Sequence, residues 1–146
     1  MLKRLLHTGD DPVLTLLRLT LGVILFAHGA QKALGWFGGY GFAGTVAAFA
    51  QVGMPTPLAL FVILTEFLGS LALIFGILAR VASAAIAVLM VGAIATVHAH
   101  AGFFMNWSGQ QRGEGFEYHL LVIALAAAIL IRGAGPLSVD GALSRT

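Results

Sequence analysis

Four apolar runs, each close to the length of a helix that crosses a bilayer, constrain this chain more than any other feature of its sequence. They cover about residues 13–34, 57–78, 81–102 and 116–132. A membrane helix needs about 20 mostly apolar residues to cross a hydrocarbon core of about 30 Å. Only 10% of the 146 residues are charged, whereas soluble domains have about 25%. The sequence therefore predicts an all-α protein, a four-helix transmembrane bundle that forms a single domain over residues 1–146.

The N-terminal run could instead belong to a secretory signal peptide, with Lys3 and Arg4 as its basic start. Polar residues from His7 to Pro12 separate those cations from the apolar run, and no small-x-small cleavage pattern ends it. The run also lasts about 20 residues, whereas the apolar core of a signal peptide usually has about 7–15. We therefore interpret it as a retained membrane helix, capped by one of the two aspartates before Pro12.

The distribution of Lys and Arg predicts the orientation of the helices. If the four runs alternate in direction, Lys3, Arg4, Arg80, Arg132 and Arg145 fall on one side of the membrane, and Lys32 and Arg112 fall on the other. Cytoplasmic loops carry the excess of positive charge. We therefore expect both termini in the cytoplasm and the loops around 35–55 and 102–115 outside. The charges form no basic stripe, so no nucleic-acid partner is expected.

Ionisable residues within the apolar runs are the clearest functional signal. Four different segments contribute them: His28, Lys32, Glu66, His98 and Glu117. A rise of about 1.5 Å per residue places all of them in the outer half of the bundle. Such groups are costly against lipid, so we expect them to face inward and to pair with one another.

Structural interpretations compete with functional ones at these positions. Arg18 lies about 9 Å from the cytoplasmic side by helix rise, where it could extend to lipid headgroups. Glu66 could form a purely structural ion pair with Lys32 or Arg18. Histidine and carboxylate ligands suit iron or zinc, and His28 with His98 could ligate haem, but no Glu-x-x-His or His-Glu-x-x-His pairing occurs. We therefore predict no metal site.

The order and spacing of these polar residues resemble one known family. The segments concerned are Arg18-Leu-Thr-Leu-Gly22, Phe26-Ala-His28-Gly29-Ala-Gln-Lys32, Glu66-Phe-Leu-Gly69 with Leu73-Ile-Phe-Gly76 and Arg80, His98 with Gly102-Phe-Phe104, and Glu117-Tyr-His-Leu with Gly133-Ala-Gly-Pro-Leu-Ser-Val-Asp140. Together they resemble the DoxX family of small four-helix bacterial membrane proteins. The resemblance implies a multi-pass protein of the prokaryotic inner (plasma) membrane. It also implies an oxidoreductase role, as a quinone-linked subunit or a partner of redox enzymes.

The resemblance also guides the choice between neighbouring candidates. His98 and His100 lie about 200° apart around a helix, as do Glu117 and His119, so only one of each pair can face a given cavity. The resemblance favours His98 and Glu117 as the inward members. We expect His100 and His119 at wet loop edges.

We predict a buried polar site that handles a quinone or protons, because a buried carboxylate beside a cation can exchange protons with a bound molecule. Its catalytic candidates are Glu66, His28, Lys32 and Glu117. Its cofactor-binding candidates are Arg18, His98, Trp107 and Asn106, with Trp107 and Asn106 at the mouth of the site. The cofactor stays open, and a quinone is favoured over haem or a metal. Some relatives act through cysteine pairs, but this chain has no cysteine.

Two further classes of function stay open. The chain could be a non-catalytic membrane scaffold or assembly subunit that holds a partner redox enzyme at the lipid bilayer. It could also be a small-solute transporter, which is disfavoured because no broken-helix repeats occur. Small residues spaced four apart, such as Ala72 and Gly76, let helix backbones approach closely and would also suit a homodimer.

Overall fold

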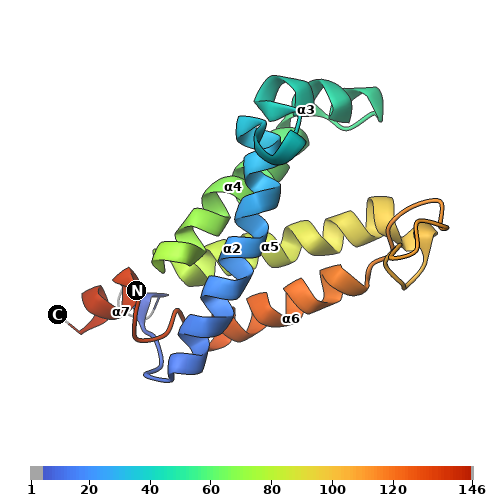
Figure 1. Ribbon diagram of the computed structural model, residues 1–146. Coiled ribbons are helices and arrows are strands. Elements are labelled where there is room, and N and C mark those ends of the chain that lie inside the picture. Colours follow the sequence, from blue (N-terminus) through green and yellow to red (C-terminus); the bar gives the residue numbers. More distant parts are fainter. Residues whose placement is uncertain (1–4, 146) are drawn as a thin grey trace.

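The fold is entirely helical in the part of the chain that a computed structural model describes, residues 5–145 (Figure 1). Its helices are α2 (Pro12–Leu34), α3 (Gly41–Gln51), α4 (Thr56–Phe75), α5 (Ala79–Ala93), α6 (Glu117–Arg132) and the short α7 (Val139–Ser144). A 3-10 turn, Trp36–Gly38, follows α2, and α5 continues through a π-helical segment, Ile94–His98, and a 3-10 turn, Ala99–Ala101. Lys3 and Arg4, which contribute to the predicted charge asymmetry, lie outside the described residues.

Within the described residues, three helices are long and apolar enough to cross a membrane. They are Pro12–Leu34, Thr56–Phe75 and the continuous stretch Ala79–Ala101. At about 1.5 Å per residue, the first is about 34 Å long, against a hydrocarbon core of about 30 Å. The helix α6 has 16 residues and reaches about 24 Å. It would therefore span the core only together with loop residues that precede it.

Local backbone chemistry sets the helix ends. The carboxylate of Asp11 accepts a hydrogen bond from the amide of Val13 at 2.9 Å, and Pro12 occupies the first helical position of α2. The helix α4 ends at Phe75, a few residues before its predicted end. Gly76 causes this early end because it adopts the left-handed conformation of a helix C-cap, with φ 67°.

Two helix pairs build the molecule. The helix α2 packs along α4, and α5 packs along α6. The two pairs meet near the chain termini and diverge toward the other end, where α3 lies across the α2–α4 pair (Figure 1). Buried apolar side chains fill the space where the pairs meet: Leu21, Leu25, Leu73, Ile86, Val122, Ala126 and Ile129. We call this the closed end of the bundle and the opposite end the open end.

The backbones of α2 and α4 touch at two glycines. A Cβ atom on Gly29 would lie 2.7 Å from the carbonyl of Glu66 and from the Cα atom of Phe67. A Cβ on Gly22 would lie 3.1 Å from the backbone nitrogen of Ile74. Small residues at such crossings let membrane helices pack at short range. The position of Glu66 relative to α2 is therefore tightly constrained.

Arg18 stabilises the closed end. Its guanidinium is 1% exposed and donates to backbone carbonyls at the end of α4, those of Leu73 and of Ile74 (2.7 Å). It also donates to the carbonyls of Ala134 (2.8 Å) and Leu137 (2.6 Å). Arg18 thus caps the last turn of α4 and ties it to the C-terminal segment.

Asp140 holds the tight turn between α4 and α5. Its carboxylate accepts from the amides of Leu78 (2.8 Å) and Ala79 (2.9 Å), and its own amide donates to the carbonyl of Gly76 at 2.9 Å. Leu78 has φ 47°, a left-handed conformation that non-glycine residues rarely adopt. The carboxylate therefore caps the start of α5 and stabilises a strained turn.

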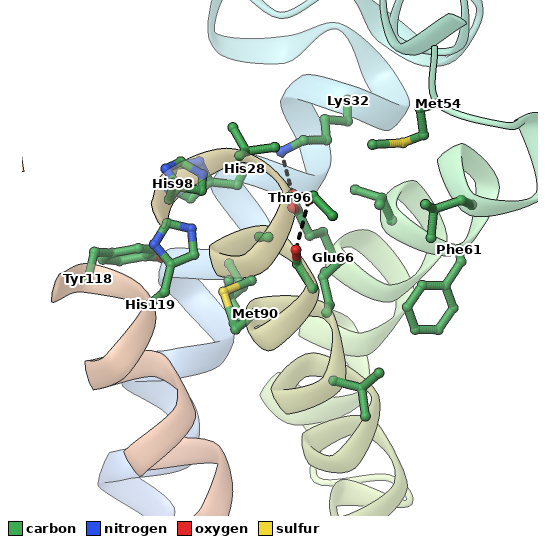
Figure 2. A pocket seen from close by; sticks show the side chains of 18 of the residues that line it. His28, Lys32, Met54, Phe61, Glu66, Met90, Thr96, His98, Tyr118 and His119 are labelled. Carbon is green, nitrogen blue, oxygen red and sulfur yellow. Dashed lines mark hydrogen bonds and ion pairs between the residues drawn. The ribbon is translucent and has the colours of Figure 1, made fainter. Parts of the chain in front are cut away.

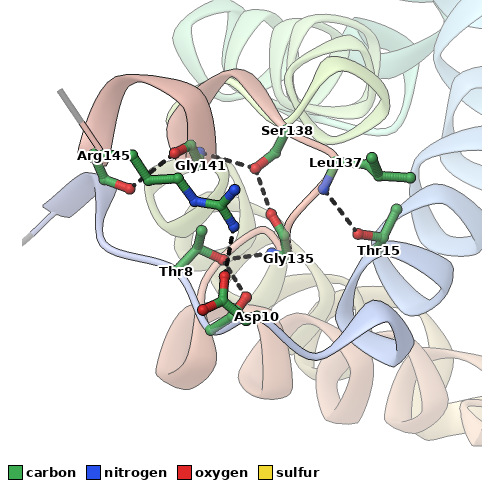
Figure 3. A network of polar contacts seen from close by, with 10 residues as sticks. Thr8, Asp10, Thr15, Gly135, Leu137, Ser138, Gly141 and Arg145 are labelled. Atoms are coloured by element: carbon green, nitrogen blue, oxygen red, sulfur yellow. Dashed lines mark hydrogen bonds and ion pairs between the residues drawn. The ribbon is translucent and has the colours of Figure 1, made fainter.

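Further hydrogen bonds join the two ends of the chain (Figure 3). The amide of Gly135 donates to the hydroxyl of Thr8 at 2.5 Å, and the Ser138 hydroxyl donates to the Gly135 carbonyl at 2.6 Å. Arg145 forms an exposed ion pair with Asp10 at 2.5 Å. We call residues 133–145 the C-terminal clasp, because this segment connects α2, α4 and α5 at the closed end.

Candidate functional site

A cavity of about 490 Å³ lies between the diverging helix pairs, toward the open end (Figure 2). Most of its lining is apolar, with Leu25, Phe49, Met54, Phe61, Val62, Leu89, Met90 and Val97 among the contributors. Its polar lining residues are His28, Lys32, Glu66, Thr96, His98, Glu114, Tyr118 and His119. A mostly apolar cavity of this size with a few convergent polar groups is typical of a small-molecule site.

An ion pair between α2 and α4 forms part of the cavity wall. The ammonium nitrogen of Lys32 lies 2.5 Å from Oε2 of Glu66, and the two side chains are 25% and 10% exposed. The Lys32 side chain therefore points inward rather than to the surface. Because the Glu66 carboxylate is nearly buried, it depends on Lys32 for stabilisation of its charge. The pair places an ionisable group at an apolar surface, where it can meet a ligand.

Four aromatic and imidazole rings form a second polar region of the cavity. The ring centroids of His98 and His119 lie 4.0 Å apart, and those of His28 and Tyr118 lie 6.1 Å apart. The Nδ1 atom of His98 lies 2.8 Å from the carbonyl oxygen of Glu114. A carbonyl can only accept, so this hydrogen bond requires a proton on Nδ1.

Two buried polar atoms in this region have no hydrogen-bond partner among residues 5–145. They are Nδ1 of His119, a residue that is 7% exposed, and the hydroxyl oxygen of Tyr118. Buried polar atoms are paired in the great majority of cases, and exceptions need an explanation. A bound molecule with a donor or acceptor would satisfy both atoms.

The helix α5 reaches this region through the π-helical segment Ile94–His98. Such segments are rare and occur frequently at functional sites, because the wider turn changes which side chains face a cavity. Thr96, Val97 and His98 of this segment all line the cavity. Sequence periodicity assumes a regular helix and contains no signal for this feature.

Glu117, a predicted catalytic residue, is not among the residues that line the cavity. Its Oε1 accepts hydrogen bonds from the amide of Met105 (2.9 Å) and from the indole of Trp107 (3.2 Å). Trp107 is 86% exposed. The loop residues that line the cavity are Met105 and Glu114, in place of the predicted Trp107 and Asn106. Glu117 therefore organises the outer loop, residues 102–116, instead of facing Glu66.

His119 was expected at a wet loop edge, and that expectation is wrong. The outer loop folds back along the start of α6, with the Phe116 amide donating to the Gly102 carbonyl (3.2 Å) and the Glu117 amide to the Phe103 carbonyl (2.9 Å). His119 lies just after this pairing, lines the cavity and is 7% exposed, with its ring against that of His98. His100, by contrast, is exposed, as expected.

Arg18, a predicted cofactor-binding residue, lies at the closed end and does not reach the cavity. It does not extend to lipid headgroups either, because backbone carbonyls bind its guanidinium inside the protein. The structure thus brings together His28, Lys32, Glu66 and His98 among the predicted site residues. Within residues 5–145, no group of three or more His, Asp or Glu side chains is arranged to hold a metal ion.

Comparison with known proteins identifies the family. The DoxX family model matches residues 13–99, which is more than half of the chain. The chain belongs to the DoxX family. It is also 31% identical, over 114 residues, to a protein of Bacillus subtilis (strain 168) named "Putative oxidoreductase CatD"; the alignment covers 78% of this chain and 75% of that protein. No solved structure matches the chain significantly.

The DoxX match agrees with the membrane character of the helices, since DoxX proteins are membrane proteins. The matched segment contains His28, Lys32, Glu66 and His98. It ends before Tyr118 and His119, the two cavity residues on α6 that sequence reasoning did not select.

Proposed function

We propose that this DoxX protein is the integral-membrane component of a redox system, and that its cavity binds a small quinone-like molecule and exchanges protons with it. The observation that carries the proposal is the Lys32–Glu66 ion pair in the wall of an otherwise apolar cavity. The oxidoreductase named as a relative supports the redox context.

The lining residues suit the chemistry of a quinone. Its reduction to a quinol takes two electrons and two protons, and its two oxygens need hydrogen-bond donors. Glu66, stabilised by Lys32, can give up and take back a proton at the cavity surface. The unpaired atoms of Tyr118 and His119 can bond to a ligand oxygen or hydroxyl. We assign the electrons to a partner redox enzyme, because the roles proposed for this chain's residues are binding and proton exchange.

In the membrane, we propose a four-helix transmembrane bundle in which α6 is the fourth crossing. Three helices meet the length requirement, and α6 packs along the third. Both termini would lie in the cytoplasm of a prokaryotic cell, with the protein in its inner membrane. Three cations lie at or next to helix ends on the closed side: Arg80, Arg132 and Arg145. This distribution agrees with the positive-inside rule. The cavity then lies in the outer half of the bilayer.

Lipid extraction of the purified protein, followed by mass spectrometry, tests the proposal. We expect a copurified quinone, or saturable binding of an added tailless quinone such as menadione, and loss of that binding in Glu66→Gln. Glu117→Gln is the matched control, because this carboxylate lies at the same end of the bundle but outside the cavity. If the purified protein contains no quinone and binds none that is added, the non-catalytic scaffold is favoured instead.

A further inference from the structure

We infer that the cavity opens sideways into the lipid between α4 and α5, and that its ligand is an amphiphile dissolved in the membrane. The polar head of this molecule enters the cavity, while its apolar tail remains between the two helices. The inference deepens the proposed function and rests on it in one respect, that the cavity binds a ligand. The rim of the cavity indicates how that ligand arrives, and the polar lining residues indicate what kind of molecule it is.

Several residues that line the cavity are also exposed at the surface of the molecule, so they form a rim. On α4, Leu58 and Phe61 are 45% and 38% exposed; on the α5 side, Val88 and Val97 are 64% and 57% exposed. Gly92 lies between the latter two in sequence, lines the cavity and is exposed. Apart from its chain neighbours and the backbone of its own helix, a Cβ atom added to Gly92 would meet no atom of residues 5–145 within 4 Å. The rim is therefore open at Gly92.

The chemistry of this rim matches lipid rather than water. Thr96, its polar member, donates its hydroxyl hydrogen to the carbonyl of Gly92 at 2.8 Å, so that its hydrogen-bonding need is met within the helix. Exposed apolar side chains continue beside the rim, with Leu64 and Leu68 on α4 and Val91 on α5. Exposed apolar surface of this extent marks a region that contacts membrane or another protein.

The rim also lies at the depth of the hydrocarbon core. At about 1.5 Å per residue, Phe61 lies about 8 Å from the start of α4 at Thr56. Gly92 lies about 14 Å from the end of the α5 stretch at Ala101 by the same measure. A molecule dissolved in the outer half of the bilayer would reach this rim without leaving the lipid.

The outer loop forms a polar side of the cavity, away from the α4–α5 rim. Met105 and Glu114 of that loop line the cavity. Hydrogen bonds to Glu117 hold Met105 in place, and the Glu114 carbonyl binds His98. An amphiphile that enters at the α4–α5 rim passes between apolar side chains and leaves these hydrogen bonds intact.

The polar residues of the cavity define the head of the amphiphile. Lys32 and Glu66 offer a charge pair, and Nδ1 of the buried His119 offers an unpaired nitrogen. These groups need a neutral head with both acceptor and donor capacity, since a head with net charge would disturb the balanced ion pair. The inferred ligand class is thus a neutral hydrogen-bonding ring or head on an aliphatic tail.

A single thiol in the cavity wall tests the route of entry, because the native chain has no cysteine. Met90→Cys places the thiol at a cavity residue that is otherwise buried. The full chain in lipid nanodiscs is treated either with N-dodecylmaleimide, an amphiphile of the inferred class, or with a charged maleimide confined to water. Each rate is normalised to that of the denatured protein, and Leu89→Cys, at another buried cavity residue, repeats the test.

We expect N-dodecylmaleimide to react faster than the charged reagent, and Gly92→Phe to slow it by about tenfold, as a raised barrier to entry would. Val91→Phe is the matched control, because its side chain is exposed on α5 beside the rim but does not line the cavity. Faster reaction of the charged reagent, equal effects of both phenylalanines, or no reaction of either thiol would each overturn the inference. The labelling requires no quinone. A failure of quinone binding would therefore refute the proposed function and leave the conclusion about the lateral opening unchanged.

Discussion

Lys32 and Glu66 form their 2.5 Å ion pair beside the point where the backbones of α2 and α4 touch. Gly29, one turn before Lys32, contacts the Glu66 carbonyl at a distance that leaves no room for a methyl group. Helix packing and charge pairing therefore depend on each other at the cavity wall. The packing of the two helices can be altered at Gly29, and the charge of the pair can be altered at Glu66.

Gly29→Ala is expected to force α2 away from α4 and to lower the free energy of unfolding by about 1–3 kcal/mol, as overpacking does. Gly92→Ala is the control, since a Cβ atom there meets nothing within 4 Å. Thermal unfolding in detergent measures both variants. Equal melting temperatures for the two would contradict the close backbone approach.

Glu66→Gln is expected to abolish quinone binding while it changes the melting temperature little. The amide keeps the shape of the carboxylate, and the ammonium of Lys32, at 25% exposure, can reach water when its partner loses its charge. Binding and melting are measured on the same preparation. Loss of folding in Glu66→Gln that Lys32→Met restores would show that the pair serves structure alone.

Arg18→Lys is expected to destabilise the bundle without weakening quinone binding in the folded fraction. A lysine cannot reproduce the planar set of donors that binds carbonyls of α4 and of the C-terminal clasp. Asp140→Ala should act in the same direction, by about 1 kcal/mol, because it removes the cap of α5. If Arg18→Lys lost quinone binding at unchanged stability, Arg18 would contribute to ligand binding instead.

Glu117→Ala is expected to loosen the outer loop, because both the Met105 amide and the Trp107 indole lose their acceptor. Amide hydrogen exchange over residues 102–116 should become faster. Trp107→Ala should have a smaller effect, since it removes an exposed ring and one hydrogen bond of 3.2 Å. Equal exchange in the wild type and Glu117→Ala would show that other contacts hold the loop.

Single cysteines test the proposed orientation. Tyr40→Cys and Ser108→Cys lie at exposed positions of the two loops that we place outside, and Leu143→Cys lies in the C-terminal clasp. A membrane-impermeant thiol reagent should label the first two in intact cells and the third only after lysis. Labelling of Leu143→Cys but not Tyr40→Cys in intact cells would reverse the orientation.

The helical class of this fold could be predicted from the sequence. Backbone N–H and C=O groups inside a bilayer must be hydrogen-bonded within the protein, which helices achieve, and apolar runs of membrane length identify such helices. Pairing of Glu66 with a cation could be anticipated for a related reason, since a lone carboxylate in an apolar bundle is costly. Both features follow from the composition of single segments and do not depend on how the loops fold.

The residues that sequence reasoning misplaced depend on loops and on distant backbone groups. His119 faces the cavity beside His98, which belongs to the π-helical segment, and nothing in the run of residues around His119 encodes that neighbour. Arg18 binds carbonyls up to 119 positions away in the sequence. Every residue has a carbonyl, so no residue type signals such a partner.

The cap that Asp140 provides has a consequence for the order in which the molecule can be completed during synthesis. The amides of Leu78 and Ala79 precede their acceptor by 62 and 61 residues. A ribosome adds about 5–20 residues per second, so these amides and the guanidinium of Arg18 wait for several seconds before the clasp emerges. A chain that stops just before Asp140 would contain α2, α4, α5 and α6 and still lack the cap of the turn between α4 and α5. The contact that fixes the α4–α5 turn is thus made long after both of its helices have been translated.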